Sequence, residues 1–142
     1  MKILVVESPA SRSREISEFV KNNNAIATRI DIKNHYDNIE EIQQFANELA
    51  NAVVGADLVI AAYLEDIKDH ADLIKKIIAG CAAIEGKSIV TIAGKLITGF
   101  RRQDFGAVVK KKSTTELIFI PKAGNSKSKL RRLEIAVGTI LK

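Results

Sequence analysis

The stretch Asp57-Leu58-Val59-Ile60-Ala61-Ala62-Tyr63 is a continuous apolar run with β-branched residues at its centre, and the acidic turn Leu64-Glu65-Asp66 follows it at once. Because polar residues do not alternate with the apolar ones, the run predicts a strand that is buried on both faces. Such a strand lies inside a parallel sheet. Residues 63–70, just past its carboxyl end, are then expected to line the crevice where open α/β sheets bind ligands.

Strand and helix patterns alternate along the rest of the chain. Four further strands are predicted at residues 2–6, 25–32, 87–93 and 115–121. The second of these alternates apolar and polar residues, which is typical of an edge strand. Apolar residues at three- and four-residue spacing predict the helices between the strands, whereas residues 94–114 follow no regular pattern.

This alternation predicts a single α/β domain over residues 1–142. The expected architecture is a three-layer sandwich with a five-stranded, mostly parallel sheet in the flavodoxin-like order 2-1-3-4-5. In that order the first and third strands are central. The loops at residues 7–14 and 63–70 would then share one crevice.

Composition sets the class of protein. At 142 residues and 46% hydrophobic residues, the chain can bury a substantial core without disulfides. The lone Cys81 lies among apolar neighbours and is expected to act as a small buried hydrophobe. The chain opens directly with a strand and has no apolar run of about 18 residues, so we expect a cytoplasmic protein without a membrane span.

The net charge of +5 is unevenly distributed. Residues 1–94 hold 10 Lys/Arg against 14 Asp/Glu, whereas residues 95–142 hold 12 against 3. The basic final third suits nucleic acid, phosphate, an anionic small molecule or an acidic protein partner. Charge alone does not choose among them.

The loop after the first strand offers the groups that bind an anion. Ser8, Ser11 and Ser13 supply hydroxyl groups, the following helix supplies free amides at its positive end, and Arg12 adds charge. The loop looks like the phosphate loop of flavodoxins, although Pro9 and Arg12 replace small residues there. The alternative is a serine-rich helix cap with solvent-exposed arginines.

The loop after the central strand carries a second group of candidates. Tyr63 could stack on a planar ligand such as a flavin or a tetrapyrrole. Glu65 and Asp66, with Asp69 and His70, could form an acid–base or metal-binding cluster. The alternative makes Tyr63 a packing residue, one aspartate a helix cap, and His70 a surface residue of the first helical turn.

No metal site is predicted. His35 is expected to stand alone in a polar loop, and a single cysteine with two histidines far apart in the sequence makes a structural zinc site improbable.

The basic final third is the strongest electrostatic feature. Its candidate ligand-binding residues are Arg101 and Arg102, with further positive charge at Lys95, Lys110, Lys111, Lys112, Lys127, Lys129, Arg131 and Arg132. Single-stranded nucleic acid stacks its bases on aromatic side chains, and only Phe100 and Phe105 are available here. A solvated basic face is the alternative to an anion or nucleic-acid surface.

From the central strand onward, the order of motifs resembles the N-terminal domain of the large subunits of magnesium and cobalt chelatases. The resemblance covers about a third of the chain and rests on a strand like Asp57–Ala61, an acidic turn with a histidine, the small-residue turn Thr91–Gly94, and the stretch Phe100-Arg101-Arg102. It implies a tetrapyrrole-related binding or docking domain. His70 stands four residues after Asp66 rather than beside the acids, and Lys95 replaces an acidic residue.

The functional prediction is therefore a ligand-binding or docking domain without established catalysis. Its anionic, or planar and anionic, ligand would lie between Ser8–Arg14 and Tyr63–Asp66, with help from Arg101 and Arg102. One alternative is a small enzyme acting on a phosphorylated metabolite, with Asp66 or Glu65 as general base. The other alternative is a nucleic-acid-binding domain that uses the basic final third. Separately, the apolar final helix could pack against a second copy of the chain.

Overall fold

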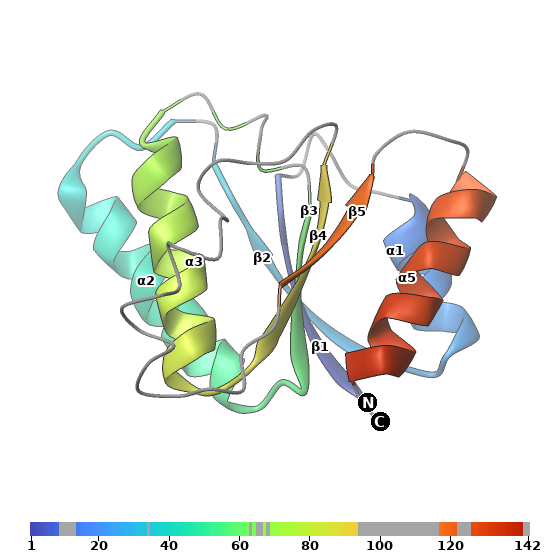
Figure 1. Ribbon diagram of the computed structural model, residues 1–142. Coiled ribbons are helices and arrows are strands. Elements are labelled where there is room, and N and C mark those ends of the chain that lie inside the picture. The colour runs from blue at the N-terminus through green and yellow to red at the C-terminus, as the bar shows by residue number, and fades with distance from the viewer. Residues whose placement is uncertain are drawn as a thin grey trace.

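The computed structural model describes residues 1–8, 14–33, 35–62, 64, 67, 69–93, 117–121 and 126–140. Strands and helices alternate along the chain (Figure 1). The elements are β1 (Lys2–Glu7), α1 (Arg14–Asn22), β2 (Ile26–Asp31), α2 (Ile39–Val54), β3 (Leu58–Ala62), α3 (Ala71–Ile84), β4 (Ser88–Ala93), β5 (Leu117–Pro121) and α5 (Ser126–Ile140). The irregular stretch at residues 94–114, in which residues 107–109 could form a short strand or a helical turn, lies outside the described residues.

The sheet confirms the predicted α/β class and the order β2-β1-β3-β4, with every neighbouring pair parallel. β5 runs parallel to β4 along its other edge, from Leu117 opposite Ile89 to Pro121 opposite Ala93. Helices cover both faces: α2 and α3 lie on one side of the sheet, α1 and α5 on the other (Figure 1). No helix of the described part of the chain is long and apolar enough to cross a membrane.

β3 is buried along its whole length, as its unbroken apolar run predicts. Val59 and Ala61 contribute to the core under α2 and α3, whereas Leu58, Ile60 and Ala62 contribute to the core under α1 and α5. At the amino edge of the sheet, the Asp57 carboxylate accepts a hydrogen bond of 2.8 Å from the Lys2 amide. This contact fixes the start of β3 beside the start of β1.

The helices place their apolar stripes on these two cores, with local differences from expectation. α2 begins where the Asn38 side chain accepts a 3.0 Å hydrogen bond from the Glu41 amide, and its buried residues include Phe45 and Leu49. In α3, Ile74 and Ile78 face the core, whereas the neighbouring Leu73 is exposed. Cys81 is half-buried rather than fully buried, and burial raises the pKa of its thiol.

Candidate functional site

The carboxyl ends of the parallel strands meet at one edge of the sheet, which is at the top of Figure 1. The chain leaves β1 toward α1 on one face, and it reaches α2 and α3 on the opposite face after β2 and β3. Helices thus depart in opposite directions from the neighbouring strands β1 and β3. This is the arrangement at which open α/β sheets bind ligands.

The structure tests little of the predicted ligand-binding set. Ser8 follows β1 directly and is buried. The other members, Ser11, Arg12, Ser13, Tyr63, Glu65, Asp66, Arg101 and Arg102, lie outside the described residues, so their part in a site stays a prediction. The described residues nevertheless bring together two groups of side chains at this edge.

The first group is a buried ion pair at the end of β1. The Glu7 side chain is 1% exposed, and its Oε1 accepts a hydrogen bond from Arg29 Nη1 at 2.5 Å. Arg29 Nη2 also donates to Ser17 Oγ of α1 at 3.2 Å. The guanidinium therefore joins β2, β1 and α1 near the carboxyl edge of the sheet. The sequence alternation placed Arg29 on one side of an edge strand but did not indicate this partner.

The second group joins the loops that follow β2 and β3. Asp69 Oδ2 contacts His35 Nδ1 at 2.7 Å, and Asp69 Oδ1 lies 3.4 Å from His70 Nε2. His35 Nε2 in turn lies 3.1 Å from Asp37 Oδ1. The prediction that His35 stands alone is wrong, because the two loops converge across the end of β1.

The start of α3 also differs from expectation. The N-cap residue is His70, no side chain caps the helix there, and Asp69 is directed to the two histidines instead. His70 has a left-handed backbone with φ of 53°. This conformation is uncommon for residues other than glycine, although histidine is among those that adopt it more often. Among the described residues, no group of three or more His, Cys, Asp or Glu side chains is arranged to hold a metal ion.

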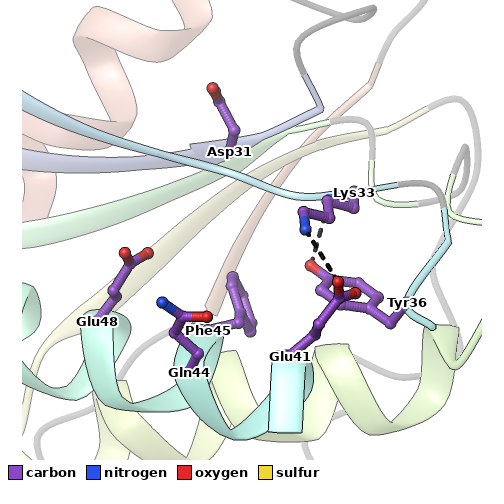
Figure 2. Close-up of a pocket in the computed structure, with 7 residues that line it drawn as sticks. All are labelled: Asp31, Lys33, Tyr36, Glu41, Gln44, Phe45 and Glu48. Atoms are coloured by element: carbon purple, nitrogen blue, oxygen red, sulfur yellow. Dashed lines mark hydrogen bonds and ion pairs between the residues drawn. The ribbon is translucent and has the colours of Figure 1, made fainter. Parts of the chain in front are cut away.

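A separate hollow of about 210 Å³ lies between the end of β2 and α2 (Figure 2). The Lys33 amide donates to Tyr36 Oη at 3.2 Å, and Lys33 Nζ lies 3.5 Å from Glu41 Oε1. The Tyr36 and Phe45 rings pack with centroids 6.2 Å apart. Burial raises the pKa of the Tyr36 hydroxyl, while the hydrogen bond from the Asp37 amide lowers the pKa of Glu41. Sequence reasoning missed this hollow, whose lining comes from the end of β2, the loop after it and α2.

Comparisons with known proteins identify the fold but no family. No protein-family model matches the sequence, and no curated protein does. Among solved structures, the CMP N-glycosidase BcmB of Clostridium botulinum aligns with a TM-score of 0.51 and 12% sequence identity, over 96% of this chain and 99% of that chain. At this identity the likeness shows a shared α/β fold alone.

Proposed function

We propose that this protein is a small enzyme that binds a nucleotide-like, phosphorylated metabolite at the carboxyl edge of its sheet. The observation that carries the proposal is the meeting of Asp69 with His35 at this edge, 2.7 Å apart. A carboxylate and an imidazole in contact are the groups most often used for general acid–base chemistry. They come from different loops, beside the point where ligands bind in sheets of this kind.

A phosphate would lie on the opposite wall, at the start of α1. Helix amino termini attract anions because their first amides have no partner within the helix. Arg14 begins α1 and its side chain is 81% exposed, with Glu18 one turn along at 3.1 Å. The predicted contributions of Ser11, Arg12 and Ser13, which lie outside the described residues, would come from the segment that directly precedes this helix.

The shared fold supports a nucleotide as the metabolite to test first. BcmB acts on CMP, and this chain aligns with it over almost the full length of both proteins. The corresponding reaction here would be hydrolysis of the bond between base and sugar, which adds water to CMP and releases cytosine and ribose 5-phosphate. Asp69, with His35 beside it, would then handle the proton that such a hydrolysis transfers.

Isothermal titration calorimetry with CMP tests binding, with cytidine and ribose 5-phosphate as comparisons. We expect CMP to bind more tightly than cytidine because the phosphate supplies the anion. Chromatography of the mixture then tests for free cytosine. Asp69→Asn should lower turnover by about 100-fold, whereas Asp72→Asn, which alters an exposed acid in the first turn of α3, should leave turnover unchanged. No binding of CMP at millimolar concentration would contradict the proposal.

The second candidate is a non-catalytic domain for an anionic ligand, including a flavin or the tetrapyrrole that the chelatase resemblance implies. The observation that favours it is positive charge on α5, where Lys127, Arg131 and Arg132 are exposed. Binding of CMP without cytosine release, or a bound chromophore in the absorption spectrum, would favour this candidate. A nucleic-acid partner would instead show affinity that falls steeply with added salt.

A further inference from the structure

We propose that His35 is a positioning residue that, in its protonated form, clamps the loop after β2 to the loop after β3. The clamp itself stands on the geometry alone. Its importance for ligand binding rests on the proposed function, because the loop after β3 forms one wall of the proposed site.

Both ring nitrogens of His35 face carboxylate oxygens. Nδ1 lies 2.7 Å from Asp69 Oδ2, and Nε2 lies 3.1 Å from Asp37 Oδ1. An ionised carboxylate only accepts hydrogen bonds, whereas a neutral imidazole has one N–H donor and one bare nitrogen. A neutral ring would therefore turn a lone pair toward one of the carboxylates. Only the imidazolium ion donates to both.

Further charged side chains surround the His35 ring. The carboxylates that face it are Asp37, Asp69 and Glu41, and the positive charge of His35 contributes to the lowered pKa of Glu41. On the basic side, Lys33 is paired with Glu41, and His70 contacts the far oxygen of Asp69. Among the described residues, the immediate surroundings of His35 are thus mainly acidic.

The clamp acts on a loop whose described residues Leu64 and Ile67 are anchored near β3. Leu64 and Ile67 are buried in the core under α2 and α3, and the Ile67 amide donates to the Leu64 carbonyl at 3.2 Å. Asp69 lies beyond these anchors, and its carboxylate contacts the imidazole rings of His35 and His70. Because the His35 side chain is 68% exposed, solvent reaches this contact and limits its strength.

Hydrogen exchange and ring ¹⁵N spectra of the ligand-free protein test the clamp directly. At pH 6 we expect both nitrogens of His35 to carry protons. We expect His35→Gln to lower the exchange protection of the Ile67 and His70 amides about threefold, the scale of an exposed ion pair. His70→Asn is the matched control, because it removes the other imidazole while suiting the left-handed backbone.

Two results would overturn the clamp: a single protonated ring nitrogen of His35 at pH 6, or equal protection in wild type and His35→Gln at that pH. These measurements need no ligand, so a failure of CMP to bind would leave the clamp standing. If CMP binds, its affinity at pH 6 should fall about threefold in His35→Gln, since the loop must be ordered on binding. Equal affinities would overturn the positioning role.

Discussion

Replacing Arg29 with methionine should destabilise the protein strongly, because the change leaves the Glu7 carboxylate buried beside an apolar side chain. The Glu7 side chain is 1% exposed and the Arg29 side chain is 28% exposed, so water reaches the ion pair from the Arg29 side only. Removing one partner of a buried ion pair costs about 3 to 5 kcal/mol. The partial exposure of Arg29 places the expected loss at the lower end, about 3 kcal/mol, or a fall in Tm of about 10 °C.

Chemical denaturation of four variants measures this effect and its origin. Glu7→Gln removes the charge but keeps a hydrogen-bond acceptor, so the double variant with Arg29→Met should lose less stability than the two single variants together. We expect a coupling free energy of at least about 1 kcal/mol. Arg14→Met is the control, because it breaks an exposed pair in α1 and should cost at most about 0.5 kcal/mol. Additive losses, or a loss below about 1 kcal/mol for Arg29→Met, would refute the reasoning.

Three further predictions concern titratable groups on the α2 and α3 side of the sheet. Tyr36→Phe keeps the ring against Phe45 but removes the acceptor of the Lys33 amide, and should lower the free energy of unfolding in urea by about 1 kcal/mol; an unchanged midpoint would count against this bond. The raised pKa of Cys81 predicts that a thiol reagent at pH 8 reacts at least about tenfold faster with unfolded protein than with folded protein, and equal rates would contradict the burial. Because the pKa of Glu41 is lowered in the folded protein, its carboxylate contributes stability at pH values above the ordinary carboxyl pKa of 4.5. This contribution is lost as the pH falls through the lowered pKa. Glu41→Gln should therefore lose less stability than wild type on acidification, and parallel pH profiles would contradict this.

The sheet was predictable because its signals are local. The unbroken apolar run of β3 indicates burial on both faces, and the alternation in β2 indicates an edge strand, which is where it lies. The spacing of apolar residues indicated the helices between the strands, and α2 buries Ile42, Phe45, Leu49 and Val53 at that spacing. The structure begins α3 at Ala71, after the left-handed residue His70, whose backbone conformation the sequence pattern does not mark.

The contacts at the carboxyl edge were not predictable in the same way. Asp69 was recognised as a candidate, but its partner His35 comes from a loop that follows a different strand. That meeting depends on the order of the strands and on how far each loop extends, neither of which is encoded within either loop. The Glu7–Arg29 pair likewise requires β1 and β2 to be neighbours in a known register.

The central claim is that the carboxyl edge of the sheet, between the start of α1 and Asp69, binds a nucleotide-like anion. Amide chemical-shift mapping of ¹⁵N-labelled protein during a CMP titration tests it most directly. The account predicts saturable shifts at Glu7, Ser8, Arg14, Asp69 and His70, with little change in the β2–α2 hollow at Gln44 and Glu48. Absence of shifts at millimolar CMP, or shifts confined to that hollow or to α5, would contradict it.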